Sequence, residues 1–175
     1  SGITTYDFEP EVPCTAVCYV DANNGNDLSG GSAITESKKT IQAAINAANP
    51  NGTVLVQPGT YTETITISKP IAVAGQGPNV KIQSLSPGVI INASDATLNN
   101  LTINGTGSDN GVTIDSSAAA IGNTTLKFIT VTNFSIGLYL TPGQPITNVT
   151  VEDSAFTSNT THGMASQNFA VDGFT

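Results

Sequence analysis

The chain has 175 residues, long enough for one domain with a buried core, and only 10% of them are charged. Five lysines, no arginine and 13 acidic residues give a formal net charge of −8, which disfavours nucleic acid as a partner. The sequence contains no apolar run long enough to cross a bilayer, so we expect no membrane span.

Residues 1–18 are predicted to form an N-terminal arm. Cys14 and Cys18 are the only cysteines, and with one distant histidine they cannot complete a zinc site. In an oxidising compartment we expect a local disulfide, which these two residues can form only across a turn. The alternative is a pair of reduced thiols.

A polar loop follows the strand that begins at Cys18. Asp21, Asn23 and Asp27 offer oxygen ligands there, so calcium is a conceivable cofactor. The spacing does not match an EF-hand, and Asx-type turns are the favoured interpretation.

Residues 40–48 are predicted to form the only helix. Ile41, Ala44, Ile45 and Ala48 make one apolar stripe, Thr40 can cap its start, and Asn49-Pro50 stops it. One helix followed only by strands suggests a lid on the end of a stack.

Short strands then follow in quick succession. They are expected at residues 54–56, 65–67, 71–73, 80–82, 89–91, 98–103, 126–131 and 146–151. Gly88, Gly111, Gly137 and Gly163 each precede a further short strand, at intervals of 23, 26 and 26 residues. This repeat fits the coils of a solenoid over about residues 53–166. An antiparallel sandwich is the competing fold, and Asn110-Gly111 is a hairpin signal that would favour it.

The segments Thr40-Ile41-Gln42-Ala43-Ala44-Ile45, Asn51-Gly52-Thr53-Val54-Leu55-Val56 and Pro58-Gly59-Thr60-Tyr61-Thr62-Glu63 resemble a known N-terminal capping coil. It is that of the right-handed parallel β-helix proteins of the pectin-lyase-like superfamily. The upstream Tyr19-Val20-Asp21 and Gly25-Asn26-Asp27 are similar to the loop before this helix in bacterial extracellular members. The resemblance is specific over about residues 19–75 and looser to about residue 164. It implies an all-β, right-handed parallel β-helix over residues 19–175, secreted or at the cell surface.

The enzymatic classes of the superfamily do not transfer to this chain. The resemblance implies an arginine base for pectate lyases and an arginine beside paired aspartates for pectin esterases, and this chain has no arginine. Polygalacturonase-like members use grouped aspartates with a histidine. Here Asp153 precedes His162 by nine positions, but the paired-aspartate motif is absent.

The remaining acid–base candidates favour surface positions over catalysis. Glu152 and Asp153 are adjacent on a strand and should point to opposite faces. Asp109 and Asp115 are a second candidate pair of carboxylates, for which surface positions are also favoured. Asp109 and His162 lie in sequences typical of turns. We assign no catalytic residue, and whether the chain is an enzyme stays undecided, with a non-enzymatic role favoured.

Eight Asn-x-Ser/Thr triplets could carry glycans in a host with the machinery. They begin at Asn51, Asn92, Asn100, Asn104, Asn123, Asn133, Asn148 and Asn159. A chain this rich in Asn and Thr also produces such triplets by chance, which is a strong alternative, and stacked coils could align some asparagines in hydrogen-bonded ladders. Binding of ice or sugar by outward Thr rows is a further alternative.

The C-terminal residues 167–175 do not resemble a lid. An open last coil would present unpaired strand edges, so the chain is a fragment, its tail folds back, or another subunit stacks on it. Residues 1–13 could bridge subunits by strand addition. We therefore expect an extracellular structural or adhesive module that self-associates or belongs to a longer surface protein. The alternative is a polysaccharide lyase or hydrolase, or a carbohydrate-binding β-helix, with polysaccharide as its partner.

Overall fold

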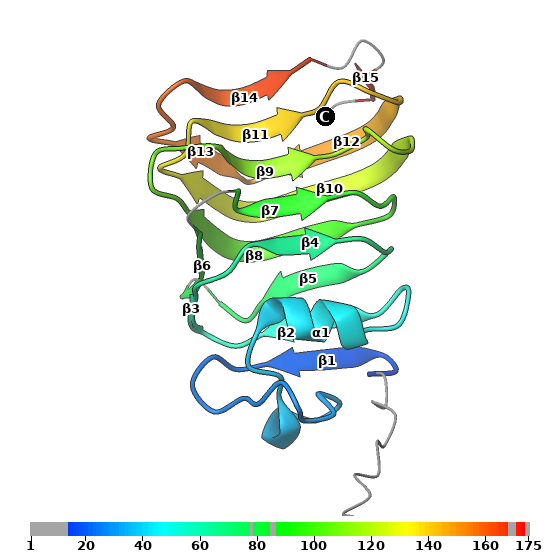
Figure 1. Cartoon of the computed structure of the whole chain (residues 1–175), viewed down its shortest axis with the longest axis vertical. Coiled ribbons are helices and arrows are strands. Elements are labelled where there is room, and N and C mark those ends of the chain that lie inside the picture. Colours follow the sequence, from blue (N-terminus) through cyan, green and yellow to red (C-terminus); the bar gives the residue numbers. More distant parts are fainter. Residues whose placement is uncertain (1–13, 78, 85–86, 168–170, 174–175) are drawn as a thin grey trace, which may run out of the picture.

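The chain winds into a right-handed parallel β-helix of about four turns. The computed structural model describes residues 14–77, 79–84, 87–167 and 171–173, and it is 48% strand and 7% helix. The first coil lies at the bottom of Figure 1 and the last coil at the top. The predicted all-β class and right-handed parallel β-helix are therefore confirmed.

Two parallel sheets run along the axis of the β-helix. The larger has ten strands, β1 (Val17–Val20), β2 (Thr53–Val56), β5 (Ala72–Gly75), β8 (Thr97–Asn104), β10 (Ile121–Thr132), β12 (Ile146–Glu152) and β15 (Val171–Asp172) in order, with β3 (Gly59–Tyr61), β6 (Val80–Gln83) and β13 (Ala155–Thr157) beside this path. The smaller has five strands, β4 (Ile65–Ile67), β7 (Val89–Ile91), β9 (Asn110–Ile114), β11 (Ile136–Leu140) and β14 (His162–Ser166).

The competing prediction of an antiparallel sandwich is wrong. Every strand pair in the described part of the chain is parallel. Asn110-Gly111 does not turn a hairpin, because these two residues open β9, which pairs with β7 on one side and β11 on the other.

The glycine-led repeat predicted from the sequence is the coil of the β-helix. Val89, Val112, Leu138 and Met164 each follow one of the four glycines, and they stand directly above one another in register. The intervals of 23, 26 and 26 residues are therefore the lengths of successive coils.

Inward-pointing residues form continuous apolar columns through the coils. Val54, Val73, Leu98 and Leu126 make one such column in the larger sheet, and all four are fully buried. Burial of each side chain contributes about 1.5–3 kcal/mol, so the shared core stabilises coils that could not close a core singly.

The helix α1 (Ile41–Ala47) lies within the predicted range of 40–48. Thr40 caps it as expected, since its Oγ1 accepts a hydrogen bond from the Ala43 N–H at 3.2 Å. The predicted apolar stripe is confirmed, because Ile41, Ala44 and Ile45 are fully buried.

The helix takes the place of a strand at the N-terminal edge of the five-stranded sheet, instead of lying across the end of the stack. Figure 1 shows α1 below β4. The Gln42 side chain completes the edge: its Oε1 accepts from the Thr66 N–H at 2.7 Å, and its Nε2 donates to the Thr66 carbonyl at 3.4 Å. The helix, which was expected to cover the end of the stack, therefore covers the edge of the five-stranded sheet instead.

The predicted arm ends earlier than residue 18. Val17 and Cys18 already belong to β1, and Cys14 forms a parallel bridge with Ala48. The described part of the arm is therefore integrated into the first coil. Residues 1–13 lie outside the described residues.

Two side chains of the second coil hold the first coil in place. The Glu63 carboxylate accepts from the Ile41 and Gln42 N–H groups at 2.8 and 3.0 Å, and its burial raises its pKa. The Tyr61 hydroxyl donates to the Gln57 carbonyl at 2.8 Å and accepts from the Ala22 N–H at 3.3 Å. Burial raises the pKa of Tyr61 to about 12.

Ionisation of Tyr61 should weaken the fold at alkaline pH. Because folding raises this pKa, the stabilisation is fully present below the pH 10 of a free phenol and is lost as the pH rises towards 12. An ultraviolet titration should show a tyrosinate phase with a midpoint near pH 12 that Tyr61→Phe lacks. An identical titration curve for the variant would contradict this placement.

Replacement of Gly111 by alanine should destabilise the protein. An added Cβ would collide with Val131 Cγ1 and lie 2.8 Å from the Gly137 carbonyl oxygen. Urea unfolding of Gly111→Ala should show a loss of about 1–3 kcal/mol from overpacking. Gly30→Ala is the matched control, because its nearest neighbours would lie at 3.9 and 4.0 Å. Equal stability of the two variants would refute the tight packing.

Candidate functional site

Asparagine ladders run along the corners where the larger sheet bends. Asp95, Asn123 and Asn148 stand in one column with φ of 57°, 55° and 52°, a conformation that Asn and Asp tolerate best. Asn148 Nδ2 donates to Asn123 Oδ1 at 3.0 Å, and Asn123 Nδ2 donates to Asp95 Oδ1 at 2.8 Å. The ladders predicted from the sequence are confirmed at these positions.

The eight predicted glycosylation triplets fall into two groups, according to whether the asparagine amide already donates a hydrogen bond. Six side-chain amides already donate hydrogen bonds, those of Asn100, Asn104, Asn123, Asn133, Asn148 and Asn159. Glycosylation uses this same amide nitrogen. Asn51 and Asn92 are exposed and form no side-chain hydrogen bond with the part of the chain that the structure describes. Among the described residues, these two remain the candidates whose amide nitrogen donates no hydrogen bond.

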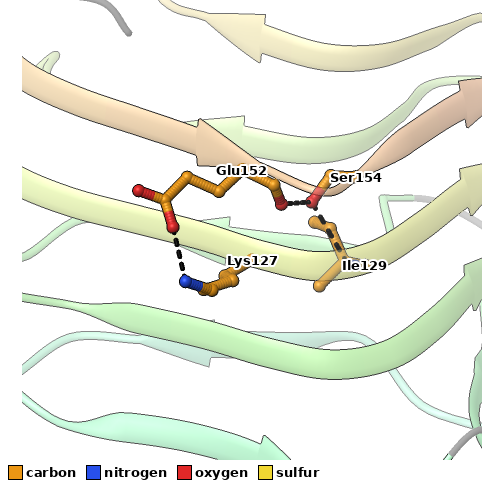
Figure 2. A network of polar contacts seen from close by, with 4 residues as sticks. All are labelled: Lys127, Ile129, Glu152 and Ser154. Carbon is orange, nitrogen blue, oxygen red and sulfur yellow. Dashed lines mark hydrogen bonds and ion pairs between the residues drawn. The ribbon is translucent and has the colours of Figure 1, made fainter.

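Glu152 and Asp153 lie at the corner between β12 and β13. Glu152 Oε2 is 2.6 Å from Lys127 Nζ, and this contact raises the pKa of Lys127 (Figure 2). Ser154 Oγ donates to the Glu152 carbonyl at 2.7 Å and accepts from the Ile129 N–H at 3.2 Å. Asp153 has φ of 45°, so the corner is a bend stabilised by Ser154.

The other acid–base candidates are held in turns and at strand ends. Asp109 has φ of 59° and its Oδ1 accepts from the Asn110 N–H at 2.9 Å, just before β9. Asp115 follows β9, and hydrogen bonds from Ser117 keep its pKa below the ordinary value. His162 is exposed at the start of β14. Within the described residues, no three His, Cys, Asp or Glu side chains are grouped to hold a metal.

The two calcium-candidate carboxylates bind backbone donors. Asp21 Oδ1 accepts from the Asn23 and Asn24 N–H groups at 2.8 and 3.1 Å, and the Asn24 side chain is the main cause of its lowered pKa. Asp27 accepts from the Lys39 and Thr40 N–H groups at 2.7 and 2.8 Å. Asp21 thus forms the Asx-type turn favoured from the sequence, and Asp27 fixes the entry to α1.

The disulfide predicted between Cys14 and Cys18 is present. The two Cα atoms are 5.2 Å apart, and a bend at residues 15 and 16 brings them together. Both cysteines are 1% exposed and belong to the hydrophobic core of the first coil. The bond therefore ties the segment before β1 to β1 itself.

Phe128 is a feature that the sequence analysis missed. It stands in a corner column between Asn100 and Asp153 and shares their left-handed backbone, with φ of 52°. It is 51% exposed, and Lys127 Nζ lies 5.2 Å from its ring centroid. A bulky residue with this backbone costs about 1–2 kcal/mol. Only the coil register, which aligns it with Asn100, could have revealed the strain.

The C-terminal end of the stack leaves inward positions uncovered. Ile65, Val89, Val112 and Leu138 form one column and are fully buried, whereas Met164, the next member, is 48% exposed. Two neighbouring columns behave alike, because Phe156 above Val131 and Val151 above Leu126 are only partly buried. We call Val151, Phe156 and Met164 the open end.

Comparison with known protein families, with curated proteins and with solved structures finds no match to this chain. Among the described residues, no helix has the length and apolar character needed to cross a membrane.

Replacement of Phe128 by Asn should stabilise the protein. Asn tolerates the left-handed backbone, so relief of strain should exceed the lost Lys127 contact of about 0.5–1 kcal/mol and leave a net gain of about 0.5–1 kcal/mol. Urea unfolding measures the gain. Leu28→Asn is the control, because Leu28 is 91% exposed and has no positive φ. A lower stability of Phe128→Asn would contradict this, because the ring contacts would then contribute more stability than the strained backbone costs.

Proposed function

We propose that this chain is a structural or adhesive module of an extracellular surface. Its open end associates with another subunit, or with further coils of a longer surface protein. The observation that carries this proposal is the single column in which four residues are fully buried and the fifth, Met164, is 48% exposed.

The physical argument concerns what a further layer would cover. Each coil of a β-helix buries its apolar face against the next coil, so the last coil has a face without its layer. At the open end this face includes Phe156 and Met164, beside β14, which is the terminal strand of the five-stranded sheet. Exposed apolar residues beside a strand edge favour association.

The extracellular location rests on the disulfide. Structural disulfides persist mainly in oxidising compartments, and the bond between Cys14 and Cys18 is buried in the core of the first coil. The low fraction of charged residues and the abundance of Ser, Thr and Asn are in keeping with this location.

We also propose that the chain is a divergent member of the pectin-lyase-like superfamily. The support is the resemblance of residues 19–75 to the capping coil of that superfamily. In this chain the same stretch folds as the end of β1, a 3-10 turn at Ile34–Glu36, α1, and the strands β2, β3, β4 and β5.

Association through the open end can be measured by sedimentation velocity over a range of protein concentrations. The unchanged chain should form a larger species as its concentration rises, and Met164→Lys should sediment as a monomer. Leu28→Lys is the matched control, since it places the same charge on an exposed apolar residue in the loop after β1. A monomer at every concentration would overturn association with another subunit and make polysaccharide degradation assays the next step.

A further inference from the structure

The N-terminal edge of the larger sheet is closed by the chain itself. At β1, the Tyr19 N–H donates to the Gly31 carbonyl at 2.8 Å, and the Tyr19 carbonyl accepts from the Lys38 N–H at 2.9 Å. The Asp21 N–H donates to the Lys38 carbonyl at 2.9 Å, and Val20 and Lys38 form a parallel bridge. The loop between β1 and α1 therefore occupies the outward backbone groups of Tyr19 and the N–H of Asp21.

The N-terminal edge of the smaller sheet is closed as well. The Gln42 side chain binds both the N–H and the carbonyl of Thr66 in β4. Ile41 and Ile45 of α1 are fully buried behind this contact. A strand from another molecule would have to displace bonds at both N-terminal edges.

The opposite end of the smaller sheet has a different edge. The Gln167 N–H donates to the Leu140 carbonyl at 3.2 Å, and Met164 is in register with Leu138. The N–H and carbonyl of one residue point to the same side of a strand, and the side alternates from residue to residue. Because Gln167 faces β11, Ala165 also faces β11 and Met164 faces outward. Met164 therefore presents an outward N–H and carbonyl together with an exposed apolar side chain.

We propose that two copies of this chain associate tail to tail, with β14 of each copy paired antiparallel to β14 of the other. A two-fold axis at Met164, the middle residue of the five-residue strand, sets its side chain against Met164 of the second copy. This inference rests on the proposed function and specifies which ends meet. A two-fold contact closes on itself, so the product is a dimer and not a filament.

The closed N-terminal edges are the reason for choosing this arrangement over head-to-tail stacking. A head-to-tail neighbour would offer β14 an edge whose backbone groups are already bonded to residues 31, 38 and 42. A second copy offers the outward N–H and carbonyl of its own Met164. Because each copy carries a formal charge of −8, the two repel at low ionic strength, so added salt should strengthen the dimer.

Met164→Pro tests the edge itself. Proline removes the N–H that points outward and leaves the ladder between β14 and β11 intact, which is the position where edge strands tolerate it. Light scattering after size exclusion should show a dimer for the unchanged chain and a monomer for this variant. Thermal melting controls for the fold of the variant. A dimer that persists in a folded Met164→Pro chain would overturn the strand pairing.

Cross-linking identifies what lies against the open end. A photoreactive benzoylphenylalanine replaces Met164 in a mixture of isotopically light and heavy full-length chains. Light-to-heavy cross-links to residues 155–166 support the tail-to-tail dimer. Cross-links to residues 21–38 would show head-to-tail stacking, which keeps end-to-end association and overturns this arrangement. Cross-links confined to one chain, at residues 1–13 or 167–175, would overturn it too, and a monomeric product would also overturn the proposed association.

Discussion

Stacking of parallel strands in register is the constraint on which this structure depends. Each residue lies directly above its equivalent in the previous coil, so a choice made at one position recurs in the next coil. Val54, Val73, Leu98 and Leu126 form a buried column for this reason. Asp95, Asn123 and Asn148 share a left-handed corner for the same reason, and they bind one another. In the last described coil the same columns end with Val151 and Phe156, which are only partly buried, and with Met164, which is 48% exposed.

The two ends of the stack meet this problem in different ways. At the N-terminal end, the loop after β1 and the helix α1 supply backbone and side-chain partners for both sheets. Glu63 and Tyr61 then fasten that closure to the second coil. At the C-terminal end, β14 is the terminal strand of its sheet and Met164 is half exposed. The two described ends of the stack therefore differ in how fully their strand edges and inward residues are covered.

The fold was predictable because its signals are local and repeated. The helix at 41–47 follows from apolar spacing, its cap from the residue type of Thr40, and the repeat from the glycine intervals. The disulfide was expected because two nearby cysteines lacked the ligands for a zinc site. The features that the sequence hides depend on register between coils. The bond between Gln42 and the β4 edge is hidden in the sequence, because its partner Thr66 lies 24 residues away. Phe128 carries strain only because it aligns with Asn100 and Asp153. The chemical role is harder still, since fold alone does not fix function.

The most direct test of an associating open end is backbone hydrogen exchange measured at low and high protein concentration. The account predicts that amide exchange in β14, at Met164 above all, slows as the concentration rises, while exchange in β1 and in the loop after it stays unchanged. Exchange in β14 that is independent of concentration, or new protection in residues 21–38 instead, would contradict the account.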